Sequence, residues 1–355
     1  MINGSPENIK YVTPETTTQK FKNIIDNLGN RTGPNVIWLK EQEDDSKIRY
    51  VEKNFTDGIP TINQTLCDFT SGLLFIAGRA NHGKSTWLIN LMNSAIKLND
   101  DLIIVDISLD DPPKKRYMQH VACIASLQGQ NLKYSQISNE ASINIDRKKA
   151  ALARAKDTFF QSIKDERLHL LESSENIDNK RISVRDYRTI ILLMRQYRAR
   201  YPKNKIAFNI DAWNNLDCSL AKPGSELQQG NQVLEALKQA SEENEIMCLI
   251  SAHIRKTTEK IITIQDIKGT SNIEYDAVCS LILRNEYRES ILSEPLMYEM
   301  ENRELPIFSI QVVKSKVGEW DYPLFYPADT GSCFIQTLHP AEYREFYEIY
   351  RGKRK

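Results

Sequence analysis

One short segment constrains the fold of this chain more than any other feature. Residues 78–85 read GRANHGKS and fit the pattern GxxxxGK[ST] at every fixed position. An apolar run at 73–77 comes directly before them, and a helical pattern through Leu88, Leu91 and Met92 follows. This order of strand, glycine loop and helix lets backbone N–H groups wrap a phosphate while the positive end of the helix faces it.

The pattern predicts a role for each residue type in the loop. Gly78 and Gly83 allow the backbone to bend and approach the ligand closely, Lys84 reaches the β- and γ-phosphates, and the Ser85 hydroxyl is available to Mg²⁺. We therefore expect a nucleoside triphosphate and Mg²⁺ as ligands, and the sequence has no Asn-Lys-x-Asp element of the kind that reads guanine in GTPases. The expected nucleotide-binding residues are Gly78, Arg79, Ala80, Asn81, His82, Gly83, Lys84, Ser85 and Thr86.

The rest of the chain alternates between apolar runs and helical patterns. The runs lie at 73–77, 102–107, 206–210, 247–251, 280–283 and 308–313, and the helical patterns at 85–97, 114–127, 147–164, 184–200 and 227–244. Continuous apolar runs are typical of strands buried on both faces. The sequence thus predicts an α/β fold, doubly wound, with a mostly parallel sheet and helices on both faces. Ser183, three residues before Asp186, is a candidate cap for the helix at 184–200.

Two further strands end in acids at the edge where ligands bind in such sheets. Asp211 ends the run at 206–210, and we expect it to coordinate Mg²⁺. The run at 102–107 is followed by Ser-Leu-Asp-Asp-Pro, in which Asp110 is the first candidate and Asp111 the second for orienting or deprotonating the attacking water. The alternative is that these acids only cap the start of a helix before Pro112.

Composition excludes several classes of protein. The 355 residues include 41% hydrophobic and 26% charged residues, as in ordinary globular proteins, and 47 basic residues balance 47 acidic ones. A net charge of zero gives no global basic field, so nucleic-acid contact has to come from a local patch. The sequence has neither a signal peptide nor an apolar stretch long enough to cross a bilayer, so we expect no membrane association and a cytoplasmic location.

From about residue 57 to 337 the chain resembles the ATPase domain of DnaB-type replicative helicases, which implies that the doubly wound α/β fold is RecA-like. The resemblance rests on the loop at 78–85 and on five weaker motifs in the family's order. They are GIPTIN at 58–63, SLDDP at 108–112, LISAH at 249–253 after Asp211, DIKGTSNIEYDAV at 266–278, and KSKVG at 314–318.

The resemblance implies roles for specific residues. Asp110 stands at the family's catalytic glutamate, His253 at the polar sensor near the γ-phosphate, and Lys314 and Lys316 at the lysine and arginine that reach the adjacent subunit's nucleotide. The expected DNA-contacting residues are Lys268, Gly269, Thr270 and Ser271. By resemblance the protein is a homohexameric DNA helicase that hydrolyses ATP and moves 5′ to 3′ on single-stranded DNA, with a primase or helicase loader as a possible partner.

The departures from the family pattern leave two alternatives open. Aspartate replaces glutamate at 110, histidine replaces glutamine at 253, and lysine replaces arginine at 316. One alternative is a RecA- or RadA-like DNA-dependent ATPase that does not unwind duplex. The other is a degenerate ATPase that serves as an adaptor in a replication or defence assembly.

The domain prediction has three parts. Residues 1–56 are expected to form an arm with a linker helix near 16–28, which packs on its own domain or docks on a neighbouring subunit, in place of the family's helical N-terminal domain. Residues 57–338 form the ATPase domain, and 339–355 form an aromatic and basic tail, either a docked helix or a binding element. The loop at 216–229 is a second candidate channel element. The arginine-rich segment at 181–201 is expected to be the polar face of a helix.

Overall fold

The computed structural model describes residues 71–171, 174–177, 180–218, 221, 224–255, 262–268, 272–288, 297–300, 303–316, 323–335, 338 and 340–354. The expected arm at 1–56, its helix near 16–28 and the motif at 58–63 lie outside this range. So do Gly269, Thr270 and Ser271 of the expected DNA loop, and parts of the loop at 216–229.

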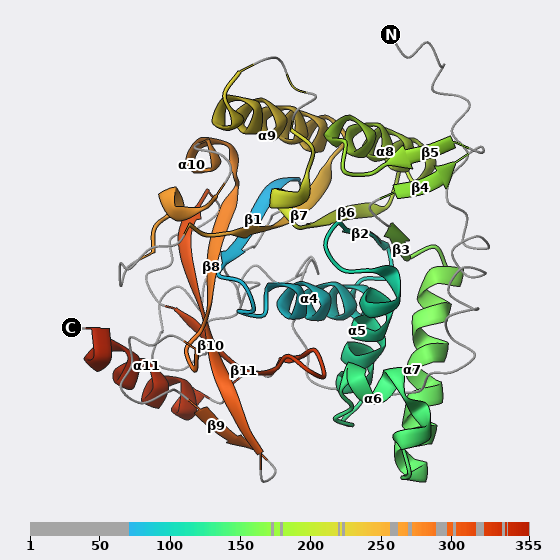
Figure 1. Cartoon of the computed structure of the whole chain (residues 1–355), viewed down its shortest axis with the longest axis vertical. Coiled ribbons are helices and arrows are strands. Elements are labelled where there is room, and N and C mark those ends of the chain that lie inside the picture. The colour runs from blue at the N-terminus through green and yellow to red at the C-terminus, as the bar shows by residue number, and fades with distance from the viewer. Residues whose placement is uncertain are drawn as a thin grey trace.

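The described chain builds one large sheet with helices on both sides (Figure 1). The strands are β1 (Gly72–Gly78), β2 (Leu102–Ser108), β3 (Leu168–Leu171), β4 (Ser174–Ile177), β5 (Lys180–Ser183), β6 (Lys205–Asp211), β7 (Ile246–His253), β8 (Cys279–Asn285), β9 (Met297–Met300), β10 (Arg303–Ser315), β11 (Leu324–Asp329) and β12 (Phe334–Ile335). The helices are α4 (Lys84–Leu98), α5 (Pro113–Ser126), α6 (Tyr134–Ser138), α7 (Asp146–Lys164), α8 (Tyr187–Arg200), α9 (Glu226–Glu243), α10 (Ile273–Asp276) and α11 (Pro340–Arg354). Three short 3₁₀ turns are η2 (Glu140–Ser142), η3 (Trp213–Asn215) and η4 (Ile264–Asp266).

The strand order in the large sheet is β12-β11-β10-β8-β1-β7-β6-β2-β3, and β9 pairs with β10, while β4 and β5 form a separate two-stranded antiparallel sheet. From β8 to β3 all neighbours are parallel, which confirms the predicted doubly wound, mostly parallel sheet. The chain leaves β1, passes over β7 and β6 to reach β2, and returns from β3 through β6 and β7 to β8 on the other side of β1, so the order reverses beside β1. Ligand crevices in open α/β sheets form at such a reversal, outside the carboxyl ends of the strands.

The two faces of β1 show why its run is apolar throughout. Leu74 and Ile76 pack in one core cluster with residues of α4, α5 and α7, while Leu73, Phe75 and Ala77 pack in a second with residues of α8 and α9. Alternate side chains of a strand point to opposite faces. A strand covered on both sides therefore needs apolar residues at odd and even positions alike.

The apolar run at 308–313 covers only part of a longer strand. It forms part of β10, which has 13 residues and runs antiparallel to β8 and β11. The chain between β8 and β10 includes β9, which pairs with β10, and antiparallel neighbours need no crossover helix. Burial on both faces explains the apolar run equally well for either strand direction.

The predicted cap of the fourth helix was wrong. Helix α8 begins at Tyr187, and its N-cap is Asp186, whose carboxylate accepts a hydrogen bond from the Arg188 backbone N–H at 3.0 Å. Ser183 is the last residue of β5 instead. A carboxylate next to the first helical residue reaches the free N–H groups of the first turn, whereas a side chain one turn earlier does not.

Helix α11 packs against the antiparallel end of the sheet, at the lower left of Figure 1. Tyr343 and Tyr350 share an apolar cluster with Ile307 and Phe325, and the Tyr343 hydroxyl donates to the Pro323 carbonyl at 2.7 Å. In the described part of the tail, the structure therefore places a docked helix. None of the described helices combines the length and apolar character that a bilayer crossing requires.

Candidate functional site

The glycine loop joins β1 to α4 in a conformation that depends on its two glycines. Gly83, the residue before α4, has φ +81°, and a Cβ added to it would lie 2.1 Å from Cε2 of Phe308. A Cβ on Gly78 would lie 2.6 Å from the Leu283 carbonyl oxygen. Neighbouring strands therefore approach the loop too closely for any side chain at these two positions.

Lys84 folds back over the loop. Its ammonium group donates to the carbonyls of Gly78 and Arg79, both at 2.9 Å, and lies 3.4 Å from Nδ1 of His253. Burial lowers the pKa of Lys84 to about 8, although Asp211 and Asp110 act in the opposite direction. The loop thus holds a buried cation whose partners are only neutral atoms, and a bound anion would stabilise it.

His82 is turned into the protein. Its Nδ1 accepts a hydrogen bond from the Asn285 backbone N–H at 3.2 Å, which ties the loop to the end of β8. Burial, followed by the charge of Arg79, lowers the pKa of His82 to about 4, so the ring is neutral at pH 7. Its neighbours Ala80 and Asn81 are exposed, and Ser85 at the start of α4 is partly exposed.

The parallel register brings three separate segments to the loop. Gly78 lies beside His253 at the end of β7, and Ser108 lies beside Asp211 at the ends of β2 and β6. The Asp211 carboxylate accepts one hydrogen bond from the Ser251 hydroxyl and another from Nη1 of Arg116, the latter at 2.9 Å. Ser251 lies on β7 and Arg116 on α5, so elements far apart in sequence meet at Asp211.

The two acids after β2 differ in their surroundings. Asp111 accepts from Lys115 Nζ at 2.5 Å and from Gln119 Nε2 at 3.1 Å, so its carboxylate is engaged by α5. Asp110 is exposed. The N-cap of α5 is Pro112, with no side-chain capping bond, so neither aspartate caps that helix. This geometry favours Asp110 over Asp111 as the group available to a ligand.

The backbone beside Asp110 is held on two sides. The Leu109 N–H donates to the Asp211 carbonyl at 2.6 Å, and the Leu109 carbonyl accepts from Nη2 of Arg185 at 2.7 Å. Other arginines of the same segment also contact carbonyls or carboxylates within the subunit, as Arg198 does with the carbonyls of Asn244 and Glu245. These contacts agree with a structural role for the segment.

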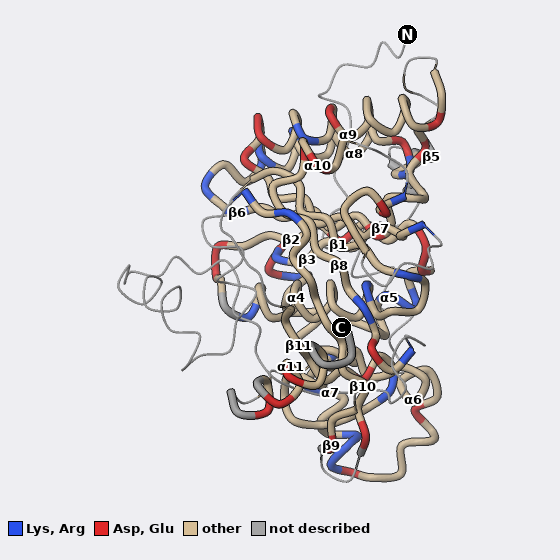
Figure 2. The backbone as a smooth tube through the Cα atoms, turned by 90° about the vertical axis from the view of Figure 1, so that its left-hand side faces the viewer, with Lys and Arg blue, Asp and Glu red and all other residues tan. Residues whose placement is uncertain are grey.

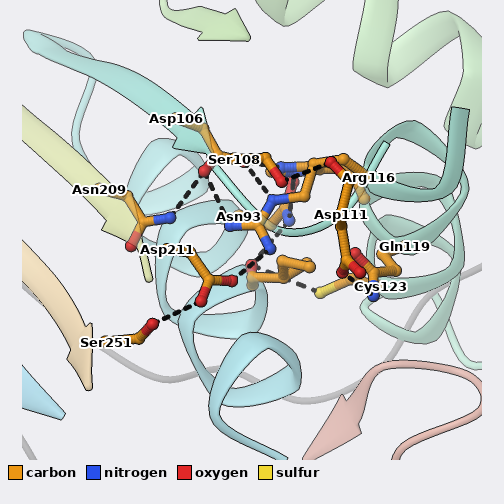
Figure 3. A network of polar contacts seen from close by, with 12 residues as sticks. Asn93, Asp106, Ser108, Asp111, Arg116, Gln119, Cys123, Asn209, Asp211 and Ser251 are labelled. Atoms are coloured by element: carbon orange, nitrogen blue, oxygen red, sulfur yellow. Dashed lines mark hydrogen bonds and ion pairs between the residues drawn. The ribbon is translucent and has the colours of Figure 1, made fainter. Parts of the chain in front are cut away.

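A buried polar network beside Asp211 was not predicted from the sequence (Figure 3). Arg116, which is 1% exposed, donates two hydrogen bonds to Asp106 in the middle of β2, at 2.7 and 2.8 Å. Asp106 also accepts from His120 Nε2 at 2.8 Å and from Asn209 Nδ2 at 2.6 Å. Burial alone raises the pKa of Asp106, but Arg116 and the hydrogen bond from His120 outweigh it and hold that pKa well below its usual range.

The sequence did contain a signal for this network. Asp106 interrupts the apolar run LIIVDIS, and a carboxylate buried in a strand needs partners. Arg116 and His120, four residues apart on α5, offer them on one helix face.

The donor set suits a nucleotide with Mg²⁺. Among the described residues no cluster of three His, Cys, Asp or Glu side chains could hold a metal ion by itself. Mg²⁺ does not need one, because it usually keeps several waters and binds one or two carboxylates together with substrate phosphates. A carboxylate has about four acceptor positions. The two hydrogen bonds to Asp211 leave acceptor capacity on each oxygen, and Ser85 offers a hydroxyl at the loop.

Lys314 and Lys316 lie away from the loop of their own chain, beside the amino end of β8. Lys314 pairs with Ser280, which is level with Phe75 of β1, whereas the loop begins three residues further on. The Lys314 ammonium donates to the Glu274 carbonyl, and that of Lys316 donates to the Tyr275 carbonyl at 2.9 Å. Both therefore contact α10, which follows the expected DNA loop.

Lys268, the one described residue of the expected DNA-contacting set, is exposed. Its backbone N–H donates to the His253 carbonyl at 2.8 Å, and the His253 N–H donates to Asn214 Oδ1 at 2.8 Å. Burial and the charge of Lys84 lower the pKa of His253. His253 is thus connected both to the glycine loop and to the segment that leads into the expected DNA loop.

Comparisons with known proteins agree with this fold. No family model and no curated protein matched the chain. Among solved structures, the chain is similar to an ATPase domain, with a TM-score of 0.62 and 14% identity over 92% of this chain and 98% of that chain. It is also similar to a DnaB-like replicative helicase studied with its primase interactions, with a TM-score of 0.61 and 15% identity over 84% of this chain and 68% of that chain. Identities this low establish a shared fold.

Proposed function

We propose that this chain, which has the fold of the ATPase domain of a DnaB-like replicative helicase, is the motor of an ATP-driven homohexameric DNA helicase. One observation carries the proposal. Lys84, Asp211 and His253 converge around the glycine loop at the carboxyl ends of the parallel strands, while Lys314 and Lys316 lie away from it, beside the amino end of β8. Each subunit would then supply half of a shared site.

ATP is the proposed substrate, and Mg²⁺ the proposed cofactor. Lys84 would leave the loop carbonyls for the β- and γ-phosphates, and Ser85 and Asp211 would hold the metal ion. When bound, Mg²⁺ supplies positive charge that offsets the charge developing on the phosphates. Asp110 would orient the attacking water, and the neutral His253 would donate or accept a hydrogen bond near the γ-phosphate.

The distance to the second half of the site supports catalysis across a subunit boundary. Three residues along a strand cover roughly 10 Å, and the two strand spacings from β1 to β10 add about another 9 Å sideways. An extended lysine side chain cannot cover that separation, so Lys314 and Lys316 would act on the nucleotide of the adjacent subunit. A cation supplied in this way couples hydrolysis to movement between subunits.

DNA contact is assigned to Lys268, Gly269, Thr270 and Ser271, as in the family that the sequence resembles. A lysine and backbone amides contact phosphates whatever the base sequence, so binding to single-stranded DNA should be sequence-tolerant and should weaken with salt. In Figure 2 basic and acidic residues are interspersed over the described chain and no broad basic side is seen, so contact with DNA would come from a local set of residues. The 5′ to 3′ direction and a primase or loader as partner are proposed by the same resemblance.

The direct test measures ATP turnover and assembly mass with and without single-stranded DNA. We expect hydrolysis that DNA stimulates and a mass about six times that of the 40.9 kDa chain. Lys84→Ala should abolish ATP binding and turnover, and Lys97→Ala, an exposed lysine on the same helix, should leave both unchanged. A tight monomer whose turnover ignores DNA would overturn the proposal.

Fork unwinding separates the proposal from its alternatives. A helicase opens a forked duplex when ATP is added, whereas a RecA- or RadA-like ATPase hydrolyses ATP without unwinding. An adaptor with a degenerate site would bind nucleotide and assemble without turnover.

A further inference from the structure

Asp211 has an unusual neighbour for a carboxylate that would hold a metal ion. The guanidinium of Arg116 donates to its Oδ2 at 2.9 Å, deep enough that Arg116 is only 1% exposed. A permanent cation at this distance competes with Mg²⁺, because opposite charges attract strongly where little water screens them. The carboxylate would then be largely neutralised before any metal arrives.

The contacts between Arg116 and Asp106 offset this competition. Two of the three hydrogen bonds that Arg116 makes to carboxylates go to Asp106, in the bidentate arrangement that is strongest for this pair. Only the third reaches Asp211. Asp106 itself is held by His120 and Asn209, and His120 Nδ1 lies 3.0 Å from Asn93 Nδ2, so the buried carboxylate is fixed in orientation.

From these contacts we infer that Asp106 is a charge-compensating residue, which lets Arg116 position Asp211 without neutralising it. Asp106 balances the guanidinium, and Arg116 and Ser251 fix the two oxygens of Asp211 from opposite sides while its negative charge remains available to Mg²⁺. The inference rests on the proposed nucleotide and Mg²⁺ site. It deepens that proposal by assigning a role to residues that would not touch the ligand.

The arrangement differs from what stability alone requires. Apolar side chains of similar volume often fill such a position without loss of stability, because burying an ion pair carries a large desolvation cost. This pair joins Asp106 of β2 to Arg116 of α5, the helix that follows the Asp110–Asp111 turn, and the remaining hydrogen bond of Arg116 reaches the carboxyl end of β6. Contacts that orient metal ligands from outside typically change metal affinity by about 10- to 100-fold when removed.

The test follows binding of a non-hydrolysable fluorescent ATP analogue as MgCl₂ is added, so it does not depend on turnover. In Asp106→Asn, Arg116 keeps its charge and loses its main partner, so Asp211 becomes the only carboxylate it contacts. We expect the Mg²⁺ concentration at half-maximal binding to rise about tenfold or more. Binding of the analogue in EDTA should change less than twofold.

Two further variants separate compensation from general damage. Asp106→Asn/Arg116→Gln removes both charges, but the Gln amide keeps an N–H group that can donate to Asp211, so the Mg²⁺ midpoint should return to within about threefold of the unmodified chain's. Ile163→Ala lowers stability in the same apolar cluster without touching the polar network, and its midpoint should not move. Circular dichroism and a melting curve check that each variant is folded.

Each outcome decides the inference. An Asp106→Asn midpoint within twofold of the unmodified chain's overturns it, and so does a double variant at least as weak as the single one. If Asp106→Asn does not fold, the uncharged double variant decides alone, and a midpoint raised tenfold or more contradicts compensation. An unmodified chain whose nucleotide binding ignores Mg²⁺ would instead refute the proposed function.

Discussion

Gly83→Ala is expected to damage both the loop and the sheet beneath it. Gly83 has φ +81°, a left-handed conformation that costs a residue with a Cβ about 1–2 kcal/mol. The new methyl group would also lie 2.1 Å from Cε2 of Phe308, a ring that is 1% exposed on β10. Forcing extra volume into a packed core costs about 1–3 kcal/mol.

The two contributions together predict a loss of about 2–5 kcal/mol in the free energy of unfolding. Urea denaturation followed by tryptophan fluorescence measures it. Phe308→Leu removes the ring atoms that the methyl group would meet, so in that background the same change should cost only the conformational part, about 1–2 kcal/mol. A cost below about 0.5 kcal/mol in the unmodified chain, or an equal cost in both backgrounds, would refute the close approach of β10 to the loop.

Three further predictions concern the site itself. Without nucleotide the pKa of Lys84 is lowered to about 8, and bound phosphates would raise that pKa. ATP affinity should therefore be full below pH 8 and fall as the pH rises above 8. Equal affinity at pH 7 and pH 9.5 in nucleotide titrations would contradict this. Asp110→Asn should lower kcat by about 10²- to 10⁴-fold with ATP binding intact, whereas Asp110→Glu should keep turnover. If Asp111→Asn alone causes such a loss, Asp111 and not Asp110 orients the attacking water. Arg185→Gln removes the hydrogen bond to the Leu109 carbonyl, so it should lower kcat while the KM for ATP stays unchanged; steady-state kinetics that show only a raised KM would reject a positioning role.

Local patterns were sufficient for most of the fold. The glycine loop placed β1 and α4, and apolar runs located β2, β6, β7 and β8, because strands covered on both faces carry apolar residues at every position. These local patterns do not reveal the direction of a strand. The run in β10 reports burial, and its antiparallel pairing depends on how β9 connects it to β8.

Some residues of the candidate site could likewise be predicted from local patterns, and others could not. Lys84 and Asp211 follow from motif and strand position, because the fold brings the carboxyl ends of parallel strands to one edge. The bond from Arg116 to Asp211 joins residues 95 apart in sequence, so no local spacing reveals it. The sequence ranked Asp110 before Asp111, and the structure adds a physical reason for that order, since Lys115 and Gln119 of α5 engage Asp111.

Mixing two inactive variants tests the shared site most directly. Lys84→Ala removes the nucleotide half of each site, and the double variant Lys314→Ala/Lys316→Ala removes the half that the neighbour would supply. In mixed rings about one boundary in four unites an intact loop with intact lysines, because each condition is met with a chance of about one half. We predict that ATP turnover, absent from either variant alone, returns on mixing to about a quarter of the unmodified level. If the variants assemble together and turnover does not return, each subunit does not complete its neighbour's site, and the account is wrong.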